Sequence, residues 1–404
     1  MPSPTPRYPM HKTLRHLTLV LVLLCPLLGW AGQALTPDEA VRAAFEASPE
    51  LRAAEAVLLQ AEGEMAQAFG ANPTLSGSVL VDGPAELQLS RPVSLTGEGM
   101  RRRQAAAARV EAANAQLRRA RFELAHAVRT AYVDAVVAIE VAEVADEGLA
   151  LAVRLVDLVS RLEAEGEASE LEVNLARLAQ AEAGLRLMEA SAFEAAAAER
   201  LSALVAMPVH AGMLARDIDV PAPSEGVEED RSDVRAAQAV VLAAERELAA
   251  QQAAALPPLV VGVRAEIDGG VTTVGPSLAV ELPLRNRNQA GRADARGELL
   301  TAQAHVVEAE AVASTEVATS RQRDELGQET VSALGLDPLA AAAAALESVE
   351  AGYVAGEIDL IQVVLLQAQI LGGQAAVVQL EGFVARARLD LLLAVEDPAL
   401  VASQ

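Results

Sequence analysis

Residues that could do chemistry are few in this chain, and they are not arranged for it. Beyond residue 34, His126, His210 and His305 lie far apart, and no pair has the spacing of metal ligands. The methionines are scattered, so no methionine-lined copper path is visible. The phosphate-binding G-x-x-x-x-G-K-S/T pattern is absent, which argues against ATP use. We therefore predict no catalytic residue, no cofactor and no metal site.

Two groups of charged residues are candidates for binding or gating. Arg101, Arg102 and Arg103 follow one another at the predicted start of a long helix, where they suit an interfacial anchor, a helix-start contact or a solvated helix face. Five glutamates crowd a predicted turn between two helices: Glu163, Glu165, Glu167, Glu170 and Glu172. They suit either a solvated turn or a negative tunnel mouth that attracts cations, and salt would screen that field beyond about 8–10 Å.

The composition points to long, closely packed helices. Of the 404 residues, 52% are hydrophobic but only 2% are aromatic. Alanine, the best helix former, replaces the bulky side chains that usually fill a core. The net charge of −24 argues against binding nucleic acid through a basic surface. The apolar content excludes intrinsic disorder, and the single cysteine excludes a disulfide framework.

The first 34 residues are typical of a secretion signal. Three basic residues and an apolar run precede the first acidic residue, Asp38. The run is short for a membrane-spanning helix, and an uncleaved anchor is the alternative. Cys25 raises the alternative of a lipoprotein, which the large Leu24 before it disfavours. Removal of this segment loses three basic groups and no acidic group, and so changes the net charge from −24 to −27.

The rest of the chain reads as two copies of one plan. Residues 72–77 and 87–92 correspond to residues 257–262 and 278–283, and Gly166 corresponds to Gly356. A proline-rich, acidic segment between the copies has the composition of a linker. We predict a signal peptide (1–34), a first repeat (35–207), a linker (208–230), a second repeat (231–397) and a C-terminal tail (398–404).

Each copy is predicted to contain a helix, two strands, a long helix, a break and a further helix. Thr36-Pro37-Asp38-Glu39 is a helix-start signal, and Ser48-Pro49-Glu50 interrupts and restarts the opening helix. Because no proline occurs between Pro92 and Pro208, the sequence predicts a helix over residues 100–163, roughly 96 Å long at about 1.5 Å per residue.

The long helix carries a coiled-coil stripe. Leu151, Leu155, Leu158 and Leu162 recur at coiled-coil spacing. No compact domain of this size holds a helix of that length, so the molecule must be elongated.

Alternating segments predict one β-hairpin in each copy. In the second copy the polar positions of the strands include Arg264, Glu266 and Glu281, whereas Leu278 and Val280 lie on the opposite face. Strands of about 9–11 residues suit a tilted transmembrane strand, although aromatic residues are absent from them. Four strands cannot close a barrel. Either they form a soluble sheet, or several chains share one barrel; three chains would supply twelve strands.

The order of these segments resembles the TolC-like outer-membrane efflux factors, and the branch of closest resemblance is the CzcC-like one, which is associated with heavy-metal efflux. The matching segments span residues 35 to about 395, and the most specific is the strand exit at 282–291. The others are 35–51, 92–103, 231–237 and 353–360.

The resemblance implies a mainly α fold: a long coiled-coil helical barrel with two β-hairpins per chain, which contribute to a shared 12-stranded trimeric β-barrel. It implies a homotrimer in outer-membrane lipid with a long periplasmic extension. Its partners would be a periplasmic adaptor (membrane fusion) protein and an inner-membrane efflux transporter, and it would conduct substrate passively, with no enzymatic activity.

The resemblance also implies two groups of site residues. Arg264, Glu266 and Glu281 would face the lumen of the barrel. The candidates for the periplasmic aperture at the helix tip are Gly166, Glu170, Glu172, Gly356, Asp359 and Gln362. Family members often place carboxylates after the tip glycine; here the second copy offers only Asp359, which puts an acidic ring in question.

The alternative to a channel is a soluble periplasmic coiled-coil scaffold that uses the same helices for protein–protein contact. An enzyme has no supporting constellation. Divalent heavy-metal cations are the substrate that the CzcC-like resemblance favours, although a wide conduit need not recognise its cargo.

Overall fold

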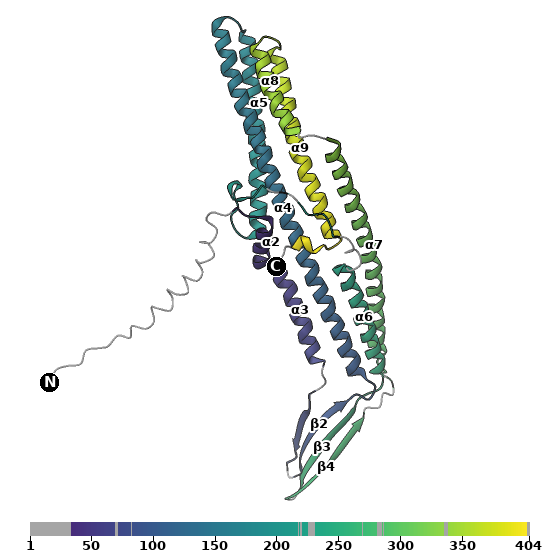
Figure 1. Cartoon of the computed structure of the whole chain (residues 1–404). Helices are drawn as coiled ribbons and strands as arrows, with labels where there is room; N and C mark the ends of the chain where they lie inside the picture. Colours follow the sequence, from purple (N-terminus) through teal and green to yellow (C-terminus); the bar gives the residue numbers. More distant parts are fainter. Residues whose placement is uncertain are drawn as a thin grey trace, which may run out of the picture.

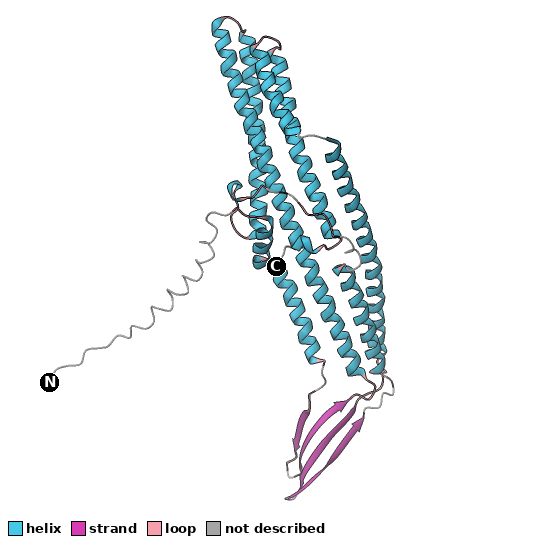
Figure 2. Cartoon of the chain, in the orientation of Figure 1, coloured by secondary structure: helices cyan, strands magenta, loops and turns pink. Residues whose placement is uncertain are grey.

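The computed structural model shows a long rod of helices with a small sheet at one end (Figures 1 and 2). It describes residues 34–68, 72–81, 83–216, 218, 220–224, 231–268, 270–280, 285, 287–334 and 338–401. The predicted signal peptide, including Cys25, lies outside the described residues except for Ala34. We call the sheet-bearing end the sheet end and the opposite end the tip.

Helices make up most of the described chain, and two hairpins supply the strands. The helices are α2 (Pro37–Ala47), α3 (Pro49–Gln67), α4 (Glu98–Glu165), α5 (Glu170–Val205), α6 (Ser232–Ala253), α7 (Gln289–Leu334), α8 (Pro338–Val354) and α9 (Leu360–Ala394). Two short 3₁₀ segments, η2 (Ala211–Met213) and η3 (Pro398–Val401), follow α5 and α9. The strands are β1 (Thr74–Val79), β2 (Ala85–Val93), β3 (Leu259–Asp268) and β4 (Val271–Val280).

The predicted start and interruption of the first helix are confirmed. Thr36 caps α2 in a reciprocal capping box with Glu39. Ser48 ends α2 and caps α3, since its Oγ accepts a hydrogen bond from the Leu51 backbone N–H at 3.2 Å. Each helix has proline in its first turn, where the missing N–H costs nothing.

Helix α4 is the continuous element that reaches from the sheet to the tip. Its 68 residues make it roughly 100 Å long at about 1.5 Å per residue. The predicted stripe is internal: Leu151 and Leu155 are buried, and Leu158 and Leu162 are half-buried. The helix pairs with α5 and α9 toward the tip and with α3 and α6 toward the sheet. The prediction of an elongated molecule is therefore confirmed (Figure 1).

Alanine and glycine let the helices approach closely. At Gly382 of α9, a β-carbon would lie 2.5 Å from the Cγ2 atom of Val137 on α4, which is closer than real contacts allow. Ala125, Ala131 and Ala135 of α4 are almost completely buried at the same level of the rod. The low aromatic content thus goes with narrow spacing between helix backbones.

The helices have the same lateral order as the strands. Toward the sheet end they follow the order α3, α4, α6, α7, and toward the tip the order α5, α4, α9, α8. The sheet order is β1-β2-β3-β4, with every neighbouring pair antiparallel. One long edge of the rod therefore comprises β1, α3 and α5, and the other comprises β4, α7 and α8.

The main core lies in the middle of the rod, around Tyr132 of α4. This side chain is completely buried, and its hydroxyl lies 2.7 Å from the carbonyl oxygen of Leu35 and 2.6 Å from that of Ala215. Its single proton can be donated to either oxygen. Leu35 also forms a parallel bridge with Leu214. Tyr132 thus attaches both the start of the first repeat and the segment after α5 to the long helix.

A buried arginine ties together three helices of the predicted second repeat beside this core. Arg231 is 5% exposed and donates hydrogen bonds to Asp233, to Glu316 of α7 and to the carbonyl oxygen of Ala394 in α9. Burial by itself would lower the pKa of Arg231, but the hydrogen bonds to Asp233 and Glu316 raise it. Because removing one partner of a buried pair leaves an uncompensated charge, this network fixes α6, α7 and α9 relative to one another.

Three details differ from the sequence predictions. Strand β1 has six residues, fewer than the nine to eleven predicted. Strand β4 begins at Val271, immediately after the Gly270 turn and several residues before Leu278 and Val280, the positions that indicated the strand in the sequence. The long helix of the second copy is divided into α7 and α8, and Pro338 begins α8 because proline suits the first helical position.

The segment predicted as a linker (208–230) also differs from the prediction, because its described part packs against the main core. Val209, Leu214 and Val220 are buried against the main core.

Tyr132→Phe should destabilise the protein by about 1–3 kcal/mol, because the buried carbonyl of Leu35 and the half-buried carbonyl of Ala215 both lose this donor. The measurement is chemical unfolding of the purified protein. The control is Tyr353→Phe near the tip, which removes a hydroxyl from a half-buried ring. Equal losses for both variants would contradict the anchoring role of Tyr132.

Candidate functional site

The sheet has one polar and one apolar face. In the antiparallel register Gln88 lies opposite Arg264, and Glu86 lies opposite Glu266. Directly opposed residues point to the same face, so the alternation extends across all four strands. The polar face comprises Ser76, Ser78, Glu86, Gln88, Ser90, Arg264, Glu266, Thr273 and Ser277.

Arg264 is the centre of charge on the polar face. Its Nε lies 3.1 Å from Oε1 of Glu86 on β2, and its Nη2 lies 3.5 Å from Oε2 of Glu266 on β3. One cation is therefore shared by two carboxylates, and the group keeps a net negative charge. Alternation in the sequence places Arg264 and Glu266 on the polar side of β3 and Glu86 on the polar side of β2, but the ion pair between Glu86 and Arg264 was not predicted. Glu281 lies outside the described residues.

The apolar face has no cover in the described part of the chain. Nine of its aliphatic side chains are between 51% and 81% exposed, whereas Val93, Leu259 and Val261 at the helix end of the sheet are less exposed. The nine are Leu75, Val79, Leu87, Leu89, Val263, Ile267, Val274, Leu278 and Val280. A continuous exposed apolar surface marks contact with a membrane or a partner.

Both edges of the sheet are also open. Strand β1 pairs only with β2, and β4 pairs only with β3, among the residues that the structure describes. Each outer edge presents unpaired backbone N–H and C=O groups, which favour pairing with another chain.

The tip is built from two turns with the same backbone geometry. Gly166 follows α4 with φ +78°, and Gly356 follows α8 with φ +72°, a region that glycine enters without strain. The N–H of Glu167 donates to the carbonyl oxygen of Leu162, and the N–H of Glu357 donates to that of Gly352, both at 2.8 Å. These hydrogen bonds close each helix in a Schellman motif.

The acidic and amide side chains after these glycines cap the next helices. Ser169 and Glu172 form a capping box at the start of α5, and Asp359 and Gln362 form one at the start of α9. An oxygen of Glu172 accepts hydrogen bonds from the backbone N–H of Ser169 at 2.6 Å and from its hydroxyl at 2.8 Å. These hydrogen bonds lower the pKa of Glu172, while burial and the charge of Asp359 act to raise it.

The structure thus brings together the tip residues that the sequence singled out: Gly166, Glu170, Glu172, Gly356, Asp359 and Gln362. An apolar cluster with Val159, Val173 and Val363 joins the two turns. Glu172, Asp359 and Gln362 are engaged in local caps, so the side chains expected at an aperture have a structural role as well.

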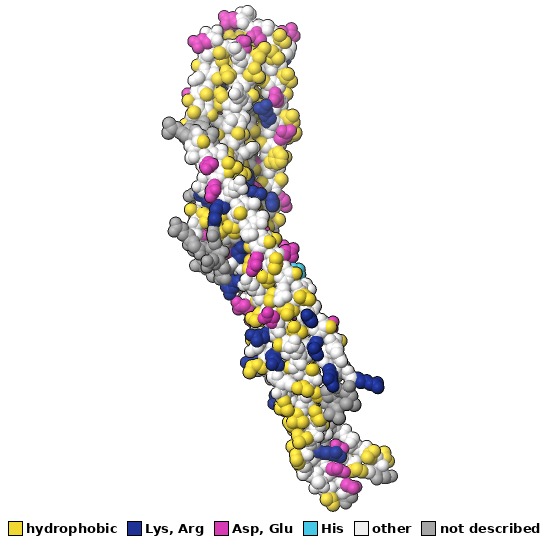
Figure 3. Space-filling model, turned by 90° about the vertical axis from the view of Figure 1, so that its right-hand side faces the viewer, with side chains coloured by type: hydrophobic (Ala, Val, Ile, Leu, Met, Phe, Trp, Pro, Cys, Tyr) yellow, Lys and Arg dark blue, Asp and Glu magenta, His cyan; other side chains and the backbone are white. Residues whose placement is uncertain are grey.

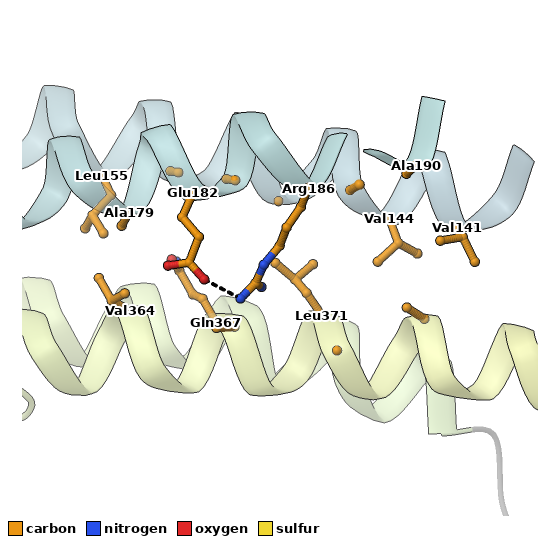
Figure 4. A pocket seen from close by; sticks show the side chains of 17 residues that line it. Val141, Val144, Leu155, Ala179, Glu182, Arg186, Ala190, Val364, Gln367 and Leu371 are labelled. Atoms are coloured by element: carbon orange, nitrogen blue, oxygen red, sulfur yellow. Dashed lines mark hydrogen bonds and ion pairs between the residues drawn. The ribbon is translucent and has the colours of Figure 1, made fainter. Parts of the chain in front are cut away.

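A lateral groove of about 230 Å³ lies between α4, α5 and α9 (Figure 4). Alanine, valine, leucine and glycine line most of the groove. Its α5 side also carries one ion pair, in which Arg186 Nη2 lies 2.6 Å from Glu182 Oε1. These residues provide no nucleophile–base pair.

The histidines lie apart. His126 contacts Asp390 at 2.8 Å, and His305 lies 3.4 Å from Glu308. Within the described residues, no group of three or more potential ligands could hold a metal ion.

Comparisons with known proteins identify the architecture. No protein-family model matches the sequence, and no curated protein matches it. Solved structures do. The outer membrane protein VceC from Vibrio cholerae superposes with a TM-score of 0.74 over 89% of this chain and 96% of its own, at 19% identity. The chain has a TolC-like fold.

Two further structures share that fold. The Campylobacter jejuni CmeC outer membrane channel gives a TM-score of 0.70 at 16% identity, over 89% of this chain and 85% of its own. The open state of the Neisseria gonorrhoeae MtrE outer membrane channel gives 0.67 at 19% identity, over 89% of each chain. The expected mainly α architecture with long helices and two hairpins is confirmed by the TolC-like fold.

Replacing Glu172 by Gln should make the α5 cap independent of pH. Because the pKa of Glu172 is lowered, its charged form stabilises the folded tip at pH values above 4.5, the ordinary pKa of a glutamate. This stabilisation is lost as the pH falls below 4.5 and through the lowered pKa of Glu172. Hydrogen exchange of amides 169–175 should therefore quicken in acid for the wild type and not for the variant, after correction for intrinsic rates.

Gln362→Glu supplies the reciprocal control, because it should bring the same acid sensitivity to the cap of α9. Equal pH dependence in all three proteins would show that the Glu172 carboxylate is not the group responsible.

Proposed function

We propose that this chain is one protomer of an outer-membrane channel in a tripartite efflux system. The observation that supports this proposal most directly is the four-stranded sheet, which combines two unpaired edges with an exposed apolar face and a polar face. In lipid every backbone group needs a partner, so the sheet is stable there only in a closed barrel built from several copies.

The two long edges of the rod support closure into a ring. Pairing β4 of one copy with β1 of the next would place α7 and α8 beside α3 and α5 of that neighbour, because strands and helices share one lateral order. Exposed apolar residues occur on both edges, including Leu178 and Leu185 of α5 and Leu300 and Val307 of α7. Such a head-to-tail contact closes when the rotation per copy divides a full turn, and three copies give twelve strands.

Helix α9 fits the same assembly. It is long and apolar enough to cross a membrane by composition alone, with a mean hydropathy of 1.5 and only 22% of its most apolar window buried. Its contacts with α4, α7 and α8 place it within the helical rod. We infer that neighbouring copies cover its remaining apolar surface.

The proposed protein is a passive conduit and not an enzyme. Its polar strand face, with Arg264 and Glu266, would line the barrel, and its tip, with Gly166, Glu170, Glu172, Gly356, Asp359 and Gln362, would lie at the periplasmic aperture. A periplasmic adaptor and an inner-membrane pump would deliver the cargo. The division into two repeats (35–207 and 231–397) with a joining segment (208–230), a leading signal (1–34) and a tail (398–404) belongs to this proposal.

Divalent metal cations are the cargo class that we propose. The resemblance to the CzcC-like branch supports this class. So does the negative tip, which carries Glu163, Glu165, Glu167, Glu170 and Glu172, the last of them close enough to Asp359 for their charges to interact. Sensitivity of a deletion strain to zinc, cobalt and cadmium, compared with a panel of drugs, tests it. Sensitivity to drugs alone would replace the metal assignment and leave the channel standing.

Val274→Arg should block assembly in the outer membrane. Val274 is 63% exposed on the apolar face near the middle of β4, where a lipid-facing arginine costs about 2–4 kcal/mol per chain. The matched control is Thr273→Arg, one residue earlier on the polar face. Membrane fractionation and heat-modified gel mobility of the trimer measure assembly.

The expected result is trimers for the wild type and Thr273→Arg and none for Val274→Arg. Recovery of all three proteins in the soluble periplasmic fraction would instead indicate the coiled-coil scaffold.

Arg264→Gln should increase the preference of the pore for cations, because it removes three positive charges per trimer and leaves Glu86 and Glu266 in place. Glu266→Gln should change it in the opposite direction. The measurement is the reversal potential of single channels in a planar bilayer under a salt gradient. Identical reversal potentials for the two variants would place the polar face outside the conduction path.

A further inference from the structure

Arginines are concentrated where the sheet joins the helices. The end of β2 with its connection to α4, and the connection from β4 to α7, together with the first turns of those helices, span residues 91–103 and 281–296. They contain eight arginines and three acidic residues, Glu98, Glu281 and Asp294, in a chain whose net charge is −24. We call these the arginine collar: Arg91, Arg101, Arg102, Arg103, Arg285, Arg287, Arg292 and Arg296.

The collar contrasts with the rest of the rod. Figure 3 shows basic side chains gathered in the helical part nearer the sheet and acidic side chains at the tip. The last turns of α3 and α6 add three acidic groups near this level, Glu62, Glu64 and Glu247, which leave the eight arginines in excess.

Arg91 fixes the position of the collar relative to the apolar band. It lies opposite Val261, which lies opposite Leu278, so its side chain belongs to the apolar face of the sheet. It is two residues from the helix end of β2, between Leu89 and Val93. A basic residue at the border of an exposed apolar band is the arrangement found at a membrane–water interface.

Much of the collar is available for an external ligand. Arg91, Arg285, Arg287, Arg292 and Arg296 are exposed, and none of them forms an ion pair with a described residue. Arg102 pairs with Glu98 at 2.7 Å yet keeps half of its side chain exposed.

The arginines are placed against the electrostatic preference of their helices. Arg101 and Arg292 both occupy the fourth position of a helix, in α4 and α7, where the positive end of the helix dipole disfavours a cation. Arg101 donates to the carbonyl oxygen of Thr96 at 2.9 Å, which satisfies part of its hydrogen-bonding capacity. An anionic ligand at this level would offset the repulsion.

Apolar side chains lie among these arginines. Leu95 is 77% exposed in the connection to α4, and Met100 is 65% exposed in its first turn. Exposed apolar side chains would add no binding energy to a surface that binds only soluble or cell-wall anions. Acyl chains beside phosphate headgroups would contact both kinds of side chain.

We propose that the arginine collar binds the phosphate headgroups of anionic phospholipids in the periplasmic leaflet of the outer membrane. The proposal rests on the proposed membrane-spanning function. The described strands contain no aromatic residue, so the collar takes the anchoring role that aromatic girdles have in other barrels. Guanidinium groups suit phosphate because they donate paired, charge-assisted hydrogen bonds.

A competition between two vesicle populations tests the collar. The full-length, detergent-solubilised protein is mixed with equal amounts of phosphatidylcholine vesicles and vesicles of phosphatidylcholine with phosphatidylglycerol, carrying different dyes, and detergent is removed. The wild type should partition into the anionic vesicles. Each arginine near an anionic bilayer surface strengthens binding about fivefold, so Arg91→Gln/Arg292→Gln/Arg296→Gln should reduce the partition ratio more than tenfold.

The matched control neutralises three exposed arginines toward the tip, in Arg154→Gln/Arg161→Gln/Arg177→Gln, and should keep the wild-type ratio. Raising the salt concentration should lower that ratio, because salt screens headgroup attraction.

The outcomes separate this proposal from the proposed function. A wild type that inserts equally into both vesicle populations overturns the collar and leaves the channel intact, whereas a wild type that inserts into neither overturns the channel. Wild-type binding to purified cell-wall sacculi that the collar variant loses, with a partition ratio near one, would assign the arginines to a cell-wall polymer and overturn the lipid proposal.

Discussion

The unsatisfied edges of a four-stranded sheet are the constraint on which the rest of this structure depends. Strands β1 and β4 each lack a partner on one side among the described residues, and one face of the sheet is aliphatic and exposed. In lipid an open strand edge leaves backbone N–H and C=O groups without hydrogen-bond partners. In water such an edge promotes pairing with another chain. In the proposed channel, the helices that adjoin the sheet bring such edges of neighbouring copies together in register.

The lateral order of the helices meets this requirement. Because α3 leads into β1 and α7 follows β4, the free strand edges continue into free helical edges along the rod. The order is kept by Tyr132, which attaches two chain segments to α4, and by Arg231, which ties α6 to α7 and α9. Small residues at the α4–α9 contact, such as Gly382, allow the backbones of these two helices to approach closely.

The two ends of the rod use charge differently. At the tip, Glu172, Asp359 and Gln362 serve first as helix caps, so the acidic character of the tip is tied to the geometry of its turns. At the sheet, Arg264 is shared by Glu86 and Glu266 on one face, while Arg91 borders the apolar band on the other. A strongly acidic chain thus concentrates its basic residues next to the sheet.

The sequence by itself determined the elements, because their signals are local. Proline spacing marked α2, α3 and α4, the leucine stripe marked the internal side of α4, and alternation assigned Arg264 and Glu266 to one face of β3. Local signals also located the glycine turns at 166 and 356. Glu86 was missed as a partner of Arg264 because the register that opposes β2 and β3 is a pairing between distant segments.

Only the tertiary structure decided which elements lie side by side. The order β1-β2-β3-β4 and the packing of Val209, Leu214 and Val220 against the core both depend on contacts between residues far apart in the chain. The pairing of β2 with β3 also brought the arginines of two connections to one end of the sheet. Periodicity fixes which side of an element is apolar, but long-range packing decides what that side meets.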